Sequence, residues 1–468
     1  MELLGGLDSL FLACETPTTH MHVCGVLTLD TTTMPKGDPF DHIRAMLVDR
    51  LPQIPPLRHV LGSLPFGIGR PFWIDDPQMD IDRHLHRLHL DSPDDHVLAE
   101  AVAEIASKQL PRDRPLWEIW VVDGIGENRT ALIAKMHHAT IDGVSGASLM
   151  GNLFDLTPTA THTDRPEEST EVQGAPNQLN FLLNALRQTM MEPVELLKLV
   201  PVTAGRLGVS AAGLLKNRAE LAGAAIPFRA PRTRFNSTIT ANRCVAFKEV
   251  PTREVKRVKD AFGVKMNDLL TAIVGGGLRR YLEERDDLPI NSLIAAEPVS
   301  AHEQAQDVRG TTKVSLMFAN LRTDIVDPIK RLEAIAVANN ASKQFRKLTG
   351  DDFLLQWAEH LWTRAVTVGM RLYSNLRVAD YHPVVHNVIV SNVAGPPIPL
   401  YLAGARLLSV YPLGPIVDGV GMNVTVFTGE DNVGFGVVAC PELVPDVWDV
   451  VDCFSKALAE LSALAPVA

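Results

Sequence analysis

Strand-like and helix-like segments alternate along most of this 468-residue chain, and this alternation limits the fold more than any other feature. Residues 20–30 and 83–90 have the composition and polar–apolar alternation of strands, whereas residues 40–51 have the spacing of an amphipathic helix. Two further strands, 117–122 and 130–136, are joined by a turn rich in Gly and Asn. The pattern predicts an α/β fold with a mixed sheet.

The same alternation returns in the second half, after a segment of different character. Residues 157–177 are polar, rich in Thr, Pro and Glu, and without periodicity, and helix-like stretches follow them. Strands and helices then alternate again, and a turn at 429–432 between two apolar runs predicts a hairpin. We therefore divide the chain into an N-terminal domain over 1–156, a linker with connector helices over 157–235, and a C-terminal domain over 236–468.

Charge and hydropathy exclude some classes of partner and location. Lys and Arg number 44 against 55 Asp and Glu, a formal charge of −11 without any basic run, so a nucleic-acid partner is not expected. A charge or proline interrupts every apolar run before the ~18 residues of a spanning helix, and the N-terminus lacks the basic start of a signal peptide. We expect a cytoplasmic protein. The mean hydropathy of +0.06 is high for so acidic a chain, which an apolar channel, a lipid-contacting face or a large core would explain.

The sharpest chemical feature is His137-His138-Ala-Thr-Ile-Asp142-Gly143, where a predicted strand ends and a predicted helix begins. A neutral imidazole can take a proton from a hydroxyl or thiol and return it to a leaving group, and we assign this role to His138. Asp142 could orient the imidazole or fix the loop through a salt bridge to an arginine. By pattern alone, a core histidine with Asp142 capping the next helix fits about as well as catalysis. A metal site fits less well, because no nearby spacing supplies further ligands.

No protein nucleophile accompanies this base in the sequence. There is no Gly-x-Ser-x-Gly elbow, and none of the five cysteines lies in a catalytic signature. A base without a protein nucleophile implies that one substrate attacks the other directly.

These features resemble one enzyme family. The His137-His138-x-x-x-Asp142-Gly143 motif is similar to the signature of acyl-CoA-dependent acyltransferases, which include chloramphenicol acetyltransferase and nonribosomal condensation domains. From end to end, the chain resembles the bacterial wax ester synthase/diacylglycerol acyltransferase family. Further matching segments are Leu7-Asp8, Phe11-Leu12, Arg114-Pro115-Leu116-Trp117-Glu118, Arg232-Thr-Arg-Phe-Asn236, Asn267-Asp268-Leu-Leu, Ser391-Asn392-Val-Ala-Gly395-Pro396, Gly421-Met-Asn-Val and Val444-Pro-Asp446. Ala394 departs from the proline more common in the family, which affects only the fine geometry of that loop.

The resemblance implies two chloramphenicol-acetyltransferase-like α/β domains with mixed sheets, joined by the helical connector, with the catalytic loop facing a channel between them. It implies that His138 deprotonates an acceptor alcohol over the acyl-CoA thioester, without an acyl-enzyme, cofactor or metal, while Asp142 pairs with an arginine. The residues assigned to catalysis are His138, His137, Asp142 and Gly143. Those assigned to substrate binding are Pro115, Leu116, Trp117, Asn267, Asp268, Ser391 and Asn392.

Some of these assignments have alternatives. Trp117 could be a buried anchor, which we favour, and Asn267 could be a helix N-cap. The implied substrates are acyl-CoA with diacylglycerol or a long-chain fatty alcohol, and contact with the inner membrane face or with lipid droplets would supply the lipid. The alternatives are an acyltransferase for another acceptor, such as a polyketide, sugar or amine, and a non-catalytic lipid-binding protein on this fold.

The role implied for Asp142 can be tested by substitution. Asp142→Asn removes a charge from the loop, so thermal stability and turnover should both fall if the carboxylate is a structural partner. The melting temperature and the rate of coenzyme A release, measured on one preparation, check this. A loss of rate at an unchanged melting temperature would support the triad role instead.

Overall fold

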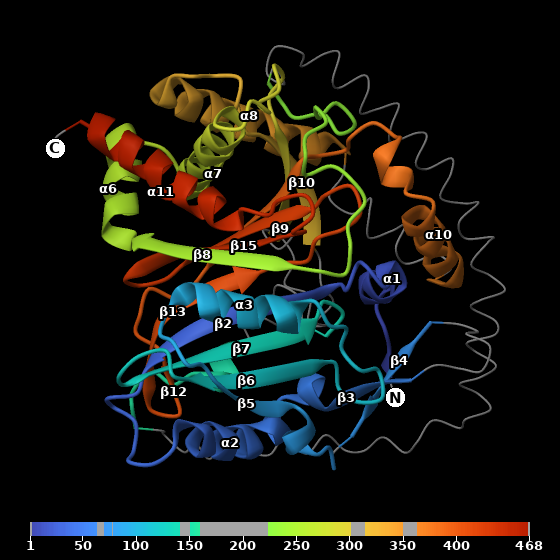
Figure 1. The fold of residues 1–468 in the computed structure, drawn as a ribbon, viewed down its shortest axis with the longest axis vertical. Coiled ribbons are helices and arrows are strands. Elements are labelled where there is room, and N and C mark those ends of the chain that lie inside the picture. The colour runs from blue at the N-terminus through green and yellow to red at the C-terminus, as the bar shows by residue number, and fades with distance from the viewer. Residues whose placement is uncertain are drawn as a thin grey trace.

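The predicted alternation of strands and helices is confirmed, and most of the described strands form two six-stranded mixed sheets (Figure 1). The protein is represented by a computed structural model, which describes residues 2–62, 70–76, 78–140, 150–159, 223–300, 314–349 and 363–466. Most of the predicted connector, residues 160–222, lies outside the described residues.

The first sheet has the strand order β12-β13-β2-β7-β6-β5. Its strands are β2 (His22–Asp30), β5 (Leu85–His89), β6 (Trp117–Asp123), β7 (Arg129–His137), β12 (Tyr401–Leu402) and β13 (Ala405–Leu413). Helices α2 (Pro39–Arg50) and α3 (Asp95–Ala106) cover opposite faces, because alternate residues of β2 pack into two different cores. Aspartates cap both helices: Asp38 accepts the backbone N–H of Phe40, and Asp94 that of His96.

The second sheet has the order β10-β9-β11-β14-β15-β8. Its strands are β8 (Cys244–Pro251), β9 (Ile294–Ser300), β10 (Val314–Asn320), β11 (Val388–Ala394), β14 (Met422–Thr428) and β15 (Asn432–Ala439). The predicted hairpin is confirmed, since β14 and β15 pair antiparallel across residues 429–431. Four helices lie on one side of this sheet, with an apolar core between them and the sheet: α6 (Thr252–Phe262), α7 (Met266–Glu283), α8 (Pro328–Thr349) and α11 (Val447–Leu464).

One strand of the first sheet comes from the second half of the chain. The strand predicted over 406–411 is β13, which pairs antiparallel with β2 along nearly its whole length. On its other side β15 approaches closely: a Cβ on Gly436 would lie 2.1 Å from the backbone oxygen of Pro412. Only a residue without a side chain allows this approach. The two halves are therefore locked together by backbone packing.

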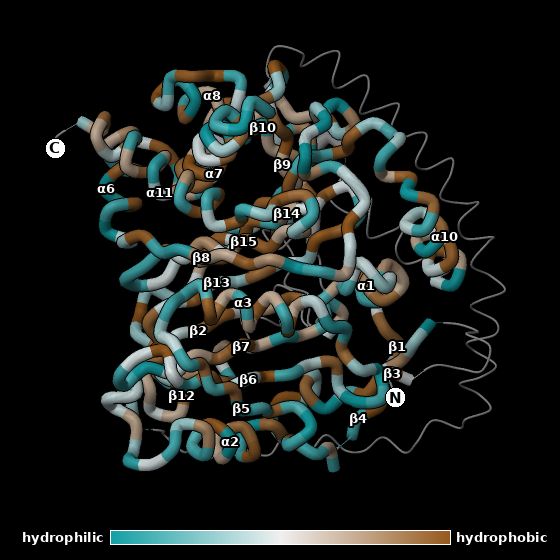
Figure 2. The backbone as a smooth tube through the Cα atoms, in the orientation of Figure 1, coloured by the Kyte–Doolittle hydropathy of each residue, from teal (hydrophilic) through white to brown (hydrophobic). Residues whose placement is uncertain are grey.

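The remaining elements lie outside the two six-stranded sheets, and the sequence reasoning did not predict most of them. They are β1 (Glu2–Leu3), α1 (Gly6–Cys14), the 3-10 turns Leu51–Gln53, Pro55–Arg58, Ile81–Arg83 and Val378–Asp380, β3 (His59–Gly62), β4 (Phe72–Asp75) and α10 (Thr363–Asn375). Helix α1 packs against α10 at one margin of the molecule, and Figure 2 shows hydrophobic and hydrophilic residues alternating along α10. Within the described residues, no helix combines the length and the apolar character needed to cross a bilayer.

The Gly275-Gly276-Gly277 run lies inside α7, where glycine is intrinsically unfavourable, and close packing explains it. A Cβ on Gly275 would lie 2.5 Å from the backbone oxygen of Leu321. Gly275→Ala should therefore lower the free energy of unfolding by about 1–3 kcal/mol. Gly369 in α10 has nothing within 4 Å of its Cβ position, so Gly369→Ala should raise stability by up to about 1 kcal/mol. Denaturant unfolding of both variants measures the contrast, and a stabilised Gly275→Ala protein would contradict the packing.

Candidate active site

The paired histidines lie where β7 ends, as the sequence predicted. His137 is the last residue of β7 and pairs with His22 at the start of β2. Its backbone N–H donates to the oxygen of Leu116 at 2.9 Å, and the N–H of His138 donates to the oxygen of Met21, also at 2.9 Å. The backbone of both histidines is thus held from two sides. Asp142 and Gly143 lie outside the described residues, and so does the start of the helix predicted after them.

The ring of His137 is buried, with one nitrogen hydrogen-bonded and the other close to a carboxylate. Its Nδ1 accepts the backbone N–H of Ala139 at 3.0 Å, and its Nε2 lies 3.7 Å from Oε2 of Glu15. Only 1% of the residue is exposed. His137 therefore has a structural role, because its buried ring is not accessible to a substrate.

The ring of His138 is half-buried and stacks on Phe11 of α1. The ring centroids are 4.3 Å apart and the planes are inclined by 29°. The stacking and the backbone hydrogen bond to Met21 hold this residue without either contact using a ring nitrogen. Of the two histidines, His138 has the exposure that a proton-transferring base requires.

Glu15, which the sequence reasoning did not single out, lies directly after α1 and pairs with both Arg112 and His137. Burial raises the pKa of the Glu15 carboxyl, but the two positively polarised partners outweigh it, and the pKa lies below its ordinary value. Glu15 is therefore a carboxylate at neutral pH. The sequence signals for this region were the matches at Leu7-Asp8 and Phe11-Leu12.

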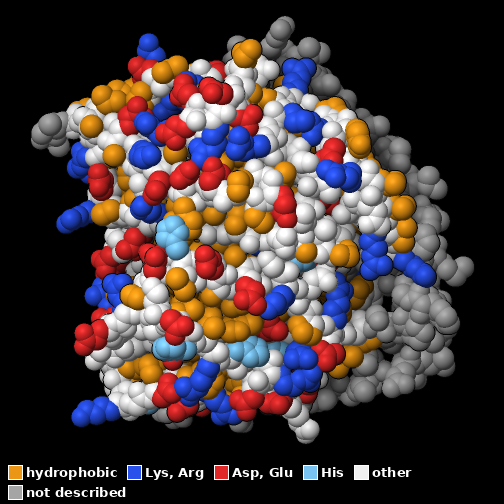
Figure 3. Space-filling model, viewed as in Figure 1, with side chains coloured by type: hydrophobic (Ala, Val, Ile, Leu, Met, Phe, Trp, Pro, Cys, Tyr) orange, Lys and Arg blue, Asp and Glu red, His pale blue; other side chains and the backbone are white. Residues whose placement is uncertain are grey.

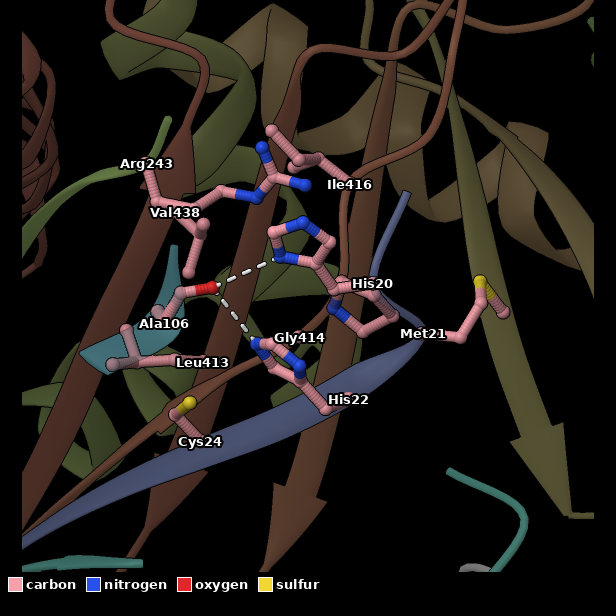
Figure 4. A pocket seen from close by; sticks show the side chains of 11 residues that line it. His20, Met21, His22, Cys24, Ala106, Arg243, Leu413, Gly414, Ile416 and Val438 are labelled. Carbon is pink, nitrogen blue, oxygen red and sulfur yellow. Dashed lines mark hydrogen bonds between the residues drawn. The ribbon is translucent and has the colours of Figure 1, made fainter. Parts of the chain in front are cut away.

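Close to the histidines, polar side chains form hydrogen bonds with carbonyl groups at and just after the end of α3. Nζ of Lys135 donates to the oxygens of Ile105 at 2.9 Å and Lys108 at 2.5 Å. Nε2 of His22 lies 2.9 Å and Nδ1 of His20 lies 3.3 Å from the oxygen of Ala106, as the dashed lines in Figure 4 show. A helix C-terminus leaves such carbonyls without intrahelical partners. The adjoining cavity, with about 10 Å³ of free volume, is too small for a substrate.

The segment Pro115-Leu116-Trp117 is buried, as the anchor interpretation of Trp117 describes. The indole N–H of Trp117 donates to the oxygen of Leu57 at 2.7 Å, and its ring stacks on His84. Leu116 contributes the carbonyl that receives the N–H of His137. These contacts make the segment a support for the motif, and a role in binding substrate stays a prediction.

Two predicted substrate-binding residues, Asn267 and Asn392, come together in the second half. Nδ2 of Asn392 lies 3.3 Å from Oδ1 of Asn267, whose own Nδ2 lies 3.3 Å from Oε2 of Glu297. Thr271 donates to the other oxygen of Glu297 at 2.9 Å. These four residues line a cavity of about 210 Å³, together with Leu270, Pro298, Val299, Val390 and Val426. Glu297 was not among the site residues predicted from the sequence. The signal that could have indicated it is a single acidic residue within an apolar strand pattern.

The other residues of these motifs do not line this cavity. Asp268 is buried and accepts a hydrogen bond from Nδ2 of Asn339 at 2.9 Å. Ser391 pairs with Thr425 in the sheet and, being next to Asn392 on a strand, points to the opposite face. The N-cap interpretation of Asn267 is wrong, because the N-cap position of α7 is Lys265 and Asn267 lies inside the first turn.

Comparison with known proteins agrees with this arrangement. The family model described as wax ester synthase/diacylglycerol acyltransferase catalytic domain matches residues 4–270, and that of the family's C-terminal domain matches residues 311–462. The chain belongs to the wax ester synthase/diacylglycerol acyltransferase family. By this membership it is an O-acyltransferase, and the resemblance drawn from its motifs is confirmed.

Two similar proteins of Mycobacterium tuberculosis are named as diacylglycerol O-acyltransferases. One is 38% identical over 98% of this chain and 90% of its own length, and another is 33% identical over 97% and 98%. The structure of a wax ester synthase/diacylglycerol acyltransferase from Marinobacter aquaeolei VT8 is 25% identical, with a TM-score of 0.67 over 99% of this chain and all of that one. The trichothecene 15-O-acetyltransferase of Fusarium sporotrichioides shares the fold, with a TM-score of 0.59 at 11% identity, covering 98% and 95% of the two chains. The predicted two-domain, chloramphenicol-acetyltransferase-like fold is confirmed.

The buried carboxyl of Glu297 gives this family member a pH-dependent stability that can be measured. Burial raises its pKa, and the hydrogen bonds from Thr271 and Asn267 only partly oppose this. When the pKa of an acid is raised on folding, the folded protein becomes less stable as pH rises from the unfolded pKa of about 4.3 to the folded pKa. Glu297→Gln removes this loss, so its free energy of unfolding relative to the wild type should increase with pH across that window. Denaturant unfolding between pH 4 and pH 8 tests this, and a constant difference would contradict it.

Proposed function

We propose that this enzyme transfers the acyl group of an acyl-CoA to the hydroxyl of a diacylglycerol or a long-chain fatty alcohol, with His138 as the general base. The support for the substrates is the family, together with relatives named as diacylglycerol O-acyltransferases. The observation that carries the choice of base is the contrast between the two histidines. The buried ring of His137 is engaged by Ala139 and Glu15, whereas His138 is half-buried at the end of β7.

The proposed reaction is a direct transfer. His138 takes the proton of the acceptor hydroxyl while the oxygen attacks the carbonyl carbon of the thioester. A tetrahedral oxyanion forms and then collapses, the carbon–sulfur bond breaks, and the proton passes from His138 to the departing thiolate of coenzyme A. The ester and free coenzyme A leave, and the enzyme returns to its starting state.

The chemistry of the cysteines supports a direct transfer over an acyl-enzyme. All five thiols are free, and burial raises the pKa of each of them. The values are about 11 for Cys14 and Cys453 and about 12 for Cys24 and Cys244. Since the thiolate is the nucleophile, these side chains are poorly suited to accept an acyl group at neutral pH.

The lipid substrates require a route from a lipid surface, and α10 is our candidate for that contact. Figure 3 shows hydrophobic side chains along the margin where α10 lies, with Lys or Arg side chains beside them. The exposed apolar residues, spaced four apart, are Val368, Leu372 and Leu376. Arg364 and Arg371 carry positive charge on the same helix of an acidic chain, and Arg377, just after it, pairs with Asp380. An apolar stripe with basic neighbours suits the interface of an anionic membrane or a lipid droplet.

The proposed role of His138 predicts that His138→Ala abolishes coenzyme A release from acyl-CoA in the presence of diacylglycerol or hexadecanol. His89→Ala is the control, because this histidine lies exposed at the end of β5, where it pairs with Asp123, and its variant should keep wild-type rates. Purified protein, labelled acyl-CoA and product analysis make the measurement. Undiminished turnover by His138→Ala would rule out His138 as the base.

The same assay with a panel of acceptors separates the substrate classes. Diacylglycerol or fatty alcohol should be the preferred acceptor, and the labelled acyl group should appear in triacylglycerol or wax ester. An enzyme inert with both lipids but active with a sugar, an amine or a polyketide alcohol would keep the acyltransferase activity and overturn the proposed acceptor. Tight binding of acyl lipid without any product would overturn the proposed reaction.

A further inference from the structure

We infer that Glu15, at the end of α1, is a positioning residue for the paired histidines, acting through His137 on the orientation of His138. The inference rests on the proposed function, because it assumes that His138 is the base. Glu15 belongs to none of the motifs that the sequence pointed to, and it is brought to the site by α1 alone. Its side chain is 5% exposed and contacts His137 from below.

The hydrogen bonds of His137 fix which ring nitrogen carries the proton. The backbone N–H of Ala139 donates to Nδ1, so Nδ1 is unprotonated. In the neutral ring the proton then lies on Nε2, which is 3.7 Å from Oε2 of Glu15. At this separation the contact is electrostatic rather than a hydrogen bond, and the burial of both side chains strengthens it. The carboxylate therefore favours the tautomer in which His137 can accept the hydrogen bond from Ala139.

That hydrogen bond shapes the backbone around His138. The N–H groups of Ala139 and Thr140 both point back to His137, the first to its ring and the second to its oxygen at 2.9 Å. His138 is the residue between, and its own N–H is held by Met21. A displaced His137 ring would shift the backbone immediately after the base. Such a shift matters because a base must lie within hydrogen-bond reach of the hydroxyl that it deprotonates.

Helix α1 contacts both histidines and so acts as one positioning element. Phe11 stacks on the ring of His138, and Glu15, four residues later, contacts the ring of His137. Arg112, in the segment between α3 and β6, pairs with Glu15, and nearly half of the Arg112 side chain stays exposed. Arg112 balances the buried charge of Glu15.

The test is Glu15→Gln in the full chain, a change that keeps the shape of the side chain and removes its charge. We expect kcat to fall on the order of 10-fold, because small displacements of a catalytic group are costly, while KM for acyl-CoA changes less than about twofold. A double-mutant cycle with His137→Gln identifies the route. If Glu15 acts through His137, adding Glu15→Gln to His137→Gln should cause no further loss of kcat.

Two control variants separate positioning from stability. Glu118→Gln removes another carboxylate beside β7, one that lies 3.8 Å from Nζ of Lys135, and should leave kcat within about twofold. Arg112→Gln breaks the ion pair of Glu15 but leaves its contact with His137, so it should lower the melting temperature while largely keeping kcat. Melting temperatures are recorded for every variant.

The outcomes distinguish this inference from the proposed function. The role of Glu15 would be overturned if Glu15→Gln kept the wild-type kcat. It would also be overturned if the kcat losses of Glu15→Gln and His137→Gln multiplied in the double mutant. Either outcome would leave the proposed acyl transfer intact. An equal loss of kcat in Arg112→Gln would assign the effect to the ion pair and also overturn it. A wild-type enzyme that releases no coenzyme A with any acceptor would instead remove the proposed function itself.

Discussion

The pairing of β13 with β2 determines where the rest of the site lies. A strand from the second half of the chain completes the first sheet, and β15 packs against it so closely that Gly434 and Gly436 are required. The start of β2 and the end of β7 consequently lie at the junction of the two halves. Arg243, just before β8, reinforces this junction by donating to the oxygen of Thr18 at 2.5 Å. The paired histidines therefore lie where both halves of the protein meet.

This junction contains buried positive charges, and backbone carbonyl groups accommodate them. A buried ammonium or guanidinium group is costly unless hydrogen bonds replace its hydration. Lys135 meets this requirement by donating to the oxygens of Ile105 in the last turn of α3 and of Lys108 just after it, and Arg243 by donating to three backbone oxygens. Burial lowers the pKa of both groups, to about 10 for Arg243. Polar groups that are satisfied in this way leave the backbone under the motif little freedom to move.

What the sequence could predict was set by local periodicity and by spacing. The strands and long helices of both sheets have clear periods, and the motif lies at the strand end where it was expected. The place of β13 in the first sheet has no local signal, since it depends on contacts between distant segments. Helix α1 is nine residues long and has no side-chain N-cap, so neither length nor capping marked it. Because α1 was not predicted from the sequence, Glu15 and Phe11 were not included in the candidate site.

The second half shows the same limit in a different form. Asn267 and Asn392 were chosen as separate motifs, and their contact across 125 residues follows only from the packing of α7 on β11. Glu297 completes their cluster from β9, where a single acidic residue gives no indication of its partners. Trp117 was easier, because a large aromatic side chain at the start of a strand is more often a core residue than a ligand. Burial could be anticipated from residue type, whereas polar clusters required the tertiary structure.

The order of the two histidines has a physical reason. A general base has to keep one ring nitrogen available for the proton that it takes, so contacts that leave that nitrogen accessible are suited to hold the residue in place. In this protein the stacking on Phe11 and the backbone hydrogen bond to Met21 both hold His138, and neither of these two contacts involves a ring nitrogen. The ring of the preceding residue, His137, is buried and accepts the backbone N–H of Ala139. The buried imidazole therefore supports the backbone after the base, while the half-buried imidazole keeps the exposure that proton transfer requires.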